Sequence, residues 1–121
     1  MSYAQNYKEQ SIYTMTRGEM LILLYDETIK RLARAEFSIK NSDMVTFEQS
    51  IQRCSEIIRY LNDTLDRKYE ISRELSRMYE FFQFQLARIS ASRNIESIIE
   101  LKGLVSEMRD SFKEANKIAR V

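Results

Sequence analysis

Residues 16–39, TRGEMLILLYDETIKRLARAEFSI, form the stretch that decides the fold. Apolar residues recur in it at steps of three and four, which predicts one long helix over 17–40 with a stripe facing a core. Thr16 followed by Glu19 forms a capping-box signature and marks the start of this helix. The predicted core stripe contains Met20, Leu21, Leu24, Tyr25, Thr28, Leu32, Ala35 and Ile39.

The same helix carries a second apolar stripe, Ile22, Ile29, Ala33 and Phe37, at spacings of seven, four and four. A helix that packs on one core needs only one such stripe. The second must be covered by another part of the chain, by an oligomer mate or by a different protein. Ile22, Ile29 and Phe37 are therefore candidate binding residues, together with Tyr25.

Composition indicates a single helical domain. The chain has 121 residues, no proline and two glycines, Gly18 and Gly103, so the residues that usually mark hairpins and turns are missing. The formal net charge is +1 without a basic run, which gives no indication of binding to nucleic acid. The longest apolar run, 20–25, is too short to insert into a membrane, and the N-terminus lacks a signal-peptide core, so we expect a cytoplasmic protein.

The chemistry that catalysis or metal binding needs is largely missing. The chain has no histidine and one cysteine, Cys54, so it cannot form a Ser/His/Asp triad, a Cys/His dyad or an internal disulfide. Cys54 lies in an apolar heptad seam, where it is interpreted as a small buried hydrophobe. We therefore expect no enzyme activity, no cofactor and no metal site.

Three further helices follow, over 44–66, 71–91 and 95–118, with Asp43 and Asn94 as the expected N-caps of the second and fourth. Four amphipathic helices with short connections predict an all-α, antiparallel four-helix bundle over 16–121. Gly103 interrupts the last helix, and we expect it to permit close approach of a neighbouring backbone.

Two further features lie off the predicted core. Residues 1–15 show no helical period and are interpreted as an extended N-terminal arm, either frayed or docked through Tyr7, Ile12 and Tyr13. In the third helix, Phe81 and Phe84 lie beside the core face. They either pack against neighbouring helices or form a surface for a partner.

The order of short motifs along the chain resembles the flagellar secretion chaperone FliS family. The motifs are YKEQSI at 7–12, TMTRGEM at 14–20, LYD at 24–26, IIRYL at 57–61, MYEF at 78–81 and MRD at 108–110. Arg17 stands where the family has a helix-start proline, and Phe112 where it has a tryptophan. The resemblance covers essentially the whole chain.

This resemblance implies a cytosolic export chaperone that binds the C-terminal segment of flagellin, keeps it from polymerising and helps bring it to a flagellar export gate component. It also implies that the arm, through Tyr7, lies over part of the empty client site. For Ile22, Ile29, Phe37, Phe81 and Phe84, the assignment is inferred from their off-core pattern. The alternative is a structural bundle that oligomerises, or an adaptor for a different amphipathic helix. We expect a monomer or a weak dimer, because a tight dimer would bury the second stripe.

Overall fold

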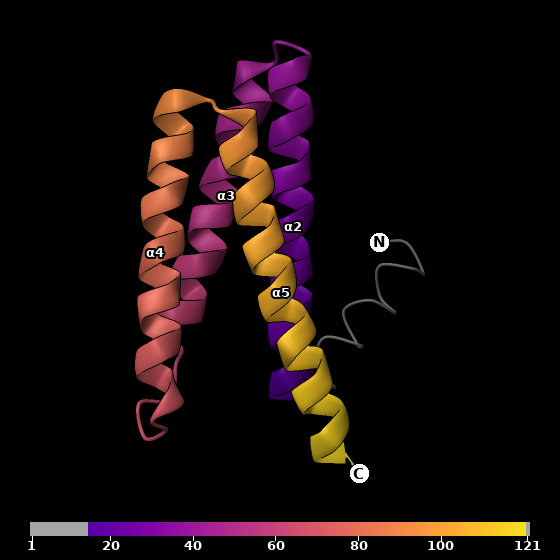
Figure 1. Cartoon of the computed structure of the whole chain (residues 1–121), viewed down its shortest axis with the longest axis vertical. Helices are drawn as coiled ribbons and strands as arrows, with labels where there is room; N and C mark the ends of the chain where they lie inside the picture. Colours follow the sequence, from indigo (N-terminus) through magenta and orange to yellow (C-terminus); the bar gives the residue numbers. More distant parts are fainter. Residues whose placement is uncertain (1–14, 121) are drawn as a thin grey trace, which may run out of the picture.

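The computed structural model describes residues 15–120, and the side chains of residues 15–117. The described residues form four helices and no strand: α2 (Arg17–Lys40), α3 (Met44–Asp63), α4 (Ile71–Ser92) and α5 (Ile95–Arg120) (Figure 1). Successive helices run in opposite directions, so the prediction of an all-α four-helix bundle is confirmed. All but the last residue of the predicted arm lies outside the described residues, and the division at residue 15 stays a prediction.

Side-chain caps fix the starts of three helices at the expected residues. Thr16 Oγ1 accepts a hydrogen bond from the Glu19 backbone N–H at 3.2 Å. Asp43 and Asn94 each accept one at 3.1 Å from the N–H group three residues further on. Each cap satisfies a donor that the first turn of a helix leaves free. Helix α3 ends at Asp63, three residues before the end predicted from its heptad seam.

The core lies between the four helices, and all four contribute side chains to it. Its fully buried large side chains include Tyr25, Leu32, Phe47, Ile58, Leu61, Tyr79, Phe82, Ile89, Ile98 and Val105. Tyr25 and Leu32 belong to the core stripe predicted for α2. Ile57 is also buried, because α2 and α4 pack on adjoining sides of α3.

The bundle is not closed evenly around its axis. Helix α2 packs extensively on both α3 and α5, whereas α4 packs mainly on α3 and makes few contacts with α5. Figure 1 shows that α4 and α5 come close near the loop that connects them and separate toward the opposite end of the bundle. Ile71 and Met78 of α4 and Ala115 of α5 have the spacing of core residues on their helices, but all three are exposed. They lie on helices α4 and α5, which diverge.

Gly103 does not have the role expected from the sequence. A Cβ atom added to Gly103 would meet nothing within 4 Å, so no neighbouring backbone requires a glycine there. At Gly18, by contrast, an added Cβ would lie 2.6 Å from Asn116 Oδ1. The expectation of close backbone approach at Gly103 is therefore wrong.

Replacing Gly103 should stabilise the protein. Glycine inside a helix is about 1 kcal/mol less favourable than alanine. Gly103→Ala should therefore raise the free energy of unfolding by about 1 kcal/mol in urea denaturation followed by circular dichroism. Gly18→Ala is the matched control and should gain less, because its methyl group must displace Asn116. An unchanged or lower stability of Gly103→Ala would contradict this prediction.

Candidate binding site

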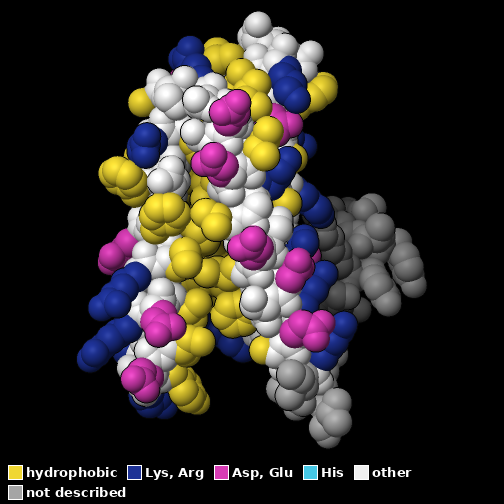
Figure 2. Space-filling model, in the orientation of Figure 1, with side chains coloured by type: hydrophobic (Ala, Val, Ile, Leu, Met, Phe, Trp, Pro, Cys, Tyr) yellow, Lys and Arg dark blue, Asp and Glu magenta, His cyan; other side chains and the backbone are white. Residues whose placement is uncertain are grey.

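The divergence of α4 and α5 leaves apolar side chains of both helices only partly covered by the described part of the chain. We name this surface the α4–α5 face and define it by Ile71, Met78 and Phe81 of α4 and Leu104 and Met108 of α5. The first four are between 38% and 56% exposed, and Met108 is half-buried against the core. Figure 2 shows hydrophobic side chains running down the surface between the two helices, which is hollowed where they separate.

A surface of this kind suits an amphipathic helix. Contiguous exposed apolar side chains on a small domain typically mark an interaction site. A helix laid along such a surface buries its own apolar stripe, and residues spaced by three, four and seven make the contacts. The α4–α5 face is long and open, and therefore fits an elongated partner better than a compact small molecule.

A second hydrophobic surface lies in the groove between α2 and α3. Its apolar part is lined by Met20 and Leu24 of α2 and by Ile57 and Tyr60 of α3, and has a volume of about 300 Å³. Tyr60 is 50% exposed. Arg53 and Glu56 also line this part of the groove.

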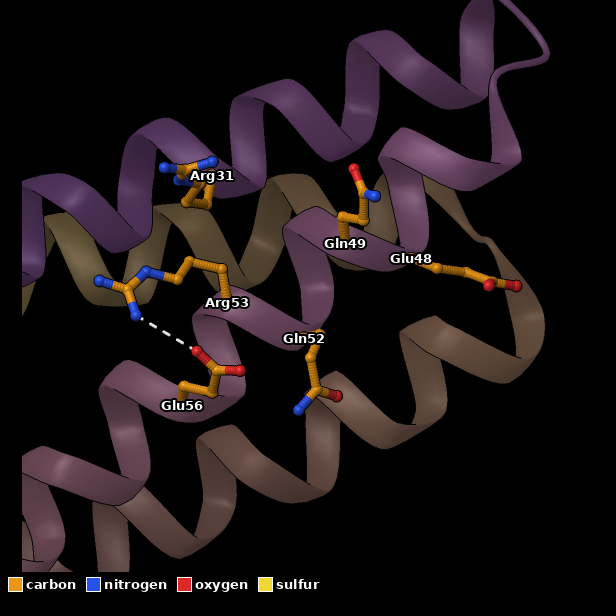
Figure 3. Close-up of a pocket in the computed structure, with 6 residues that line it drawn as sticks. All are labelled: Arg31, Glu48, Gln49, Gln52, Arg53 and Glu56. Carbon is orange, nitrogen blue, oxygen red and sulfur yellow. Dashed lines mark hydrogen bonds and ion pairs between the residues drawn. The ribbon is translucent and has the colours of Figure 1, made fainter.

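The groove continues past Arg53 and Glu56 into a polar part (Figure 3). Arg31 of α2 lies across from the α3 residues, among them Gln49 and Gln52. Both arginines that line this polar part form ion pairs: Arg53 contacts Glu56 at 3.2 Å, and Arg31 contacts Glu27 at 2.9 Å. The groove thus offers an apolar end and a neutral hydrogen-bonding end, which suits a peptide more than an anion.

Polar contacts attach α4 to α3. Gln83 accepts a hydrogen bond from the Ser55 hydroxyl at 2.8 Å and donates one to the Ser55 carbonyl at 2.8 Å. Nearer the start of α4, Ser76 donates to Asn62 Oδ1 at 2.8 Å. Directional bonds of this kind fix the position of one helix on another. They hold one flank of α4 against α3. The other flank of α4 is therefore turned toward the α4–α5 face.

The buried polar groups beneath these surfaces do not resemble catalytic groups. The Tyr25 and Tyr79 hydroxyl oxygens lie 2.5 Å apart and hydrogen-bond to each other. Burial raises the pKa of both phenols, and burial raises the pKa of the Cys54 thiol to about 12. Cys54 therefore remains a thiol at neutral pH and has little nucleophilic character.

The candidate binding residues predicted from sequence differ in their burial and do not all lie on the surface. Tyr7, Ile12 and Tyr13 lie outside the described residues. Tyr25 is fully buried, which removes it from any surface in this conformation. The others divide between half-buried positions, Ile22 and Ile29, and exposed ones, Phe37, Phe81 and Phe84.

Part of the second α2 stripe is covered by the chain itself. Helix α5 packs along α2, with ion pairs between Asp26 and Arg109 at 3.0 Å and between Glu36 and Lys102 at 3.6 Å. Ile29 packs against the core, whereas Phe37 stays 67% exposed. The stripe therefore does not form one continuous surface with Phe81 and Phe84, which lie on α4.

Sequence reasoning missed Leu104 and Tyr60. Leu104 shares a helix side with Leu101 and Met108, three residues before it and four after, and this spacing could have indicated its place. Tyr60 directly precedes the buried Leu61, and no sequence pattern distinguished it from an isolated exposed aromatic residue.

The described part of the chain contains no cluster of three or more cysteine, aspartate or glutamate residues arranged to hold a metal ion. None of the described helices is both long and apolar enough to cross a membrane. What the described residues present is a rigid helical scaffold with two apolar surfaces, which defines a protein-binding module.

Comparison with known proteins identifies the family of this module. The family profile described as "Flagellar protein FliS" matches residues 1–119, so the chain belongs to the FliS family of flagellar secretion chaperones. It is 30% identical over 109 residues to the flagellar secretion chaperone FliS of Bacillus subtilis (strain 168), covering 90% of this chain and 82% of that protein. It is 24% identical over 116 residues to the chaperone of the same name from Salmonella typhimurium, covering 93% and 86%. The resemblance inferred from the sequence motifs is confirmed.

Proposed function

We propose that this chain binds the C-terminal segment of flagellin in the cytoplasm, prevents its premature polymerisation and assists its delivery to the flagellar export apparatus through a gate component. Membership of a flagellar secretion chaperone family supports a role before export. The observation that carries the proposal is the α4–α5 face, which is apolar, elongated and uncovered by the described residues.

The physical basis is coupled folding and binding. A disordered segment that becomes helical on the chaperone buries an apolar stripe but loses conformational entropy. That loss moderates the affinity while a large surface is covered, which suits a client that must later be released. The α2–α3 groove, with Leu24, Ile57 and Tyr60, offers a second contact for the same extended client.

The candidate residues have different parts in this proposal. Phe81 contributes to the α4–α5 face directly. Ile22, Ile29 and Phe37 would contact a client that continues onto α2. Tyr7, Ile12 and Tyr13 would compete with the client for the empty site, as the family resemblance implies for Tyr7. Tyr25 supports the scaffold from within the core.

The experiment is an isothermal titration of the full chain with the C-terminal segment of flagellin from the same organism. We expect one-to-one binding and a far-UV circular dichroism signal more helical than the sum of the two components. An equally long segment from the N-terminal part of the same flagellin serves as the control and should not bind. Absence of binding by a well-folded chain would contradict the proposal, and binding of both segments would contradict its specificity.

A further inference from the structure

Two methionines belong to the α4–α5 face, one on each helix. Met78 is 39% exposed, and Met108 is half-buried against the core. Met78 lies 14 residues before the end of α4 at Ser92, and Met108 lies 13 residues after the start of α5 at Ile95. At 1.5 Å per residue, both lie about 20 Å along their helices from the loop that connects α4 and α5. Because these helices run in opposite directions (Figure 1), the two methionines border the same part of the face.

The thioether sulfur is the oxidisable group of this apolar face. Oxidation converts methionine to its sulfoxide, and enzymes can reverse the reaction. With hydrogen peroxide, a sulfur lone pair attacks one oxygen atom and the O–O bond breaks. The departing hydroxide takes up the proton of the transferred oxygen and leaves as water. The sulfur is thereby oxidised by two electrons, the peroxide is reduced, and the side chain gains one oxygen atom.

Cys54, the single cysteine of the chain, does not compete for the oxidant. It is fully buried, and burial raises the pKa of its thiol to about 12. A thiol reacts through its thiolate, which is scarce at neutral pH for such a group. Oxidation therefore falls on accessible methionines. Met78 should react before Met108, because it is the more exposed of the two.

A sulfoxide on this face opposes the binding of an apolar partner. Oxidation replaces a flexible apolar side chain by a polar one, which disrupts interfaces that contain methionine. The other side chains that define the face, those of Ile71, Phe81 and Leu104, carry no hydrogen-bond donor. Beneath a bound client helix, the sulfoxide oxygen would lose its water without gaining a partner from them, and such burial is unfavourable.

We propose that Met78 and Met108 form a modification site at which reversible oxidation releases the client. Oxidants of the peroxide class lower the affinity of the α4–α5 face by forming the sulfoxides, and methionine sulfoxide reductases restore it. An elongated client that lies between α4 and α5 contacts both residues, so oxidation of either one weakens its binding. This inference rests on the proposed function, because it assigns regulation to the proposed client site.

The test oxidises the full chain alone with hydrogen peroxide, removes the peroxide with catalase and then titrates the flagellin C-terminal segment by calorimetry. Peptide mass spectrometry identifies the oxidised methionines, and we expect Met78 to gain oxygen before Met108. The oxidised chain should bind the segment roughly tenfold more weakly, while its circular dichroism stays unchanged. Treatment with the two methionine sulfoxide reductases, one for each sulfoxide epimer, should restore the affinity without any change of sequence.

Two double variants locate the effect. Met78→Leu/Met108→Leu removes both sulfurs and nearly keeps the apolar volume. It should bind the client like the wild type and keep its affinity after peroxide treatment. Met20→Leu/Met44→Leu is the matched control, because it removes two partly exposed methionines outside the α4–α5 face. This control should lose affinity after treatment as the wild type does.

Two outcomes would overturn the inference. One is an oxidised wild type, with Met78 converted to the sulfoxide, that binds the client as tightly as the untreated chain. The other is a Met78→Leu/Met108→Leu variant that loses as much affinity on treatment as the control variant. Failure of the proposed function would look different, since the untreated wild type would then not bind the segment at all.

Discussion

Leu104→Glu should weaken binding of the flagellin C-terminal segment about 100-fold, which corresponds to about 2.7 kcal/mol. Leu104 lies on α5 in the α4–α5 face and is 38% exposed, so it can contact a client without being part of the inner core. A glutamate there removes apolar contact area and places a carboxylate where the client would exclude water. Burying an unpaired charge adds to the loss of apolar contact.

The appropriate control is Val45→Glu. Val45 is 68% exposed near the start of α3, and it does not belong to either apolar surface. The substitution introduces the same charge at an exposed aliphatic residue, and titration calorimetry should find client affinity within twofold of the wild type. If Leu104→Glu bound the client as tightly as Val45→Glu does, the α4–α5 face would not be the client site.

A companion variant on the facing helix reports how the client lies. Met78→Glu is expected to cause a similar loss, because Met78 of α4 and Leu104 of α5 border the same face. A client helix that occupies the space between the two helices contacts both. Loss of affinity in only one of the two variants would mean that the client runs along a single helix.

Helix starts and core positions could be predicted from the sequence because both depend on local chemistry and residue spacing. A helix start is a local event, and Thr16, Asp43 and Asn94 were identified from the side-chain chemistry of a few neighbouring residues. Core positions of α2 and α3 followed from spacing, since both helices have close neighbours on their apolar sides.

The open side of the bundle could not be predicted in this way. Ile71 and Met78 have the spacing of core residues, and spacing alone does not tell whether another helix covers them. That depends on the angle between α4 and α5, and α5 packs extensively on α2 but makes few contacts with α4. The same limit applies to Gly103, where the sequence indicated a special position but not that its surroundings are open.

Alkaline pH should unfold this protein steeply, through three buried acids. Burial raises the pKa of Tyr25, Tyr79 and Cys54 above their ordinary values of 10.0, 10.0 and 9.0. The unfolded chain releases these protons at the ordinary values while the folded chain retains them. Above pH 9 the unfolded state therefore binds fewer protons, and the free energy of unfolding falls as pH rises.

The free energy of unfolding is expected to fall steeply with rising pH. Each group that is ionised only in the unfolded state lowers the free energy of unfolding by about 1.4 kcal/mol per pH unit. Where all three groups are ionised in the unfolded state and still protonated in the folded state, together they give about 4 kcal/mol per unit, against a plateau between pH 6 and 8 where all are protonated in both states. Urea unfolding at a series of pH values, followed by circular dichroism, measures this slope.

Two double variants test whether the buried tyrosines cause this dependence of the free energy of unfolding on pH. Tyr25→Phe/Tyr79→Phe should reduce it to about 1.4 kcal/mol per pH unit, because Cys54 alone then remains. The double variant Tyr60→Phe/Tyr69→Phe removes two exposed phenols and should leave the slope unchanged. Equal slopes in the two double variants would show that the buried hydroxyl pair does not govern alkaline unfolding.

The single tyrosine variants distinguish proton linkage from packing. At pH 7, Tyr25→Phe leaves the buried Tyr79 hydroxyl without its partner 2.5 Å away, and an unsatisfied buried polar group costs about 1–3 kcal/mol. Removing both hydroxyls avoids this cost, so the double variant should be more stable than either single variant at pH 7. The opposite order would mean that the two hydroxyls contribute independently, which their mutual burial between α2 and α4 argues against.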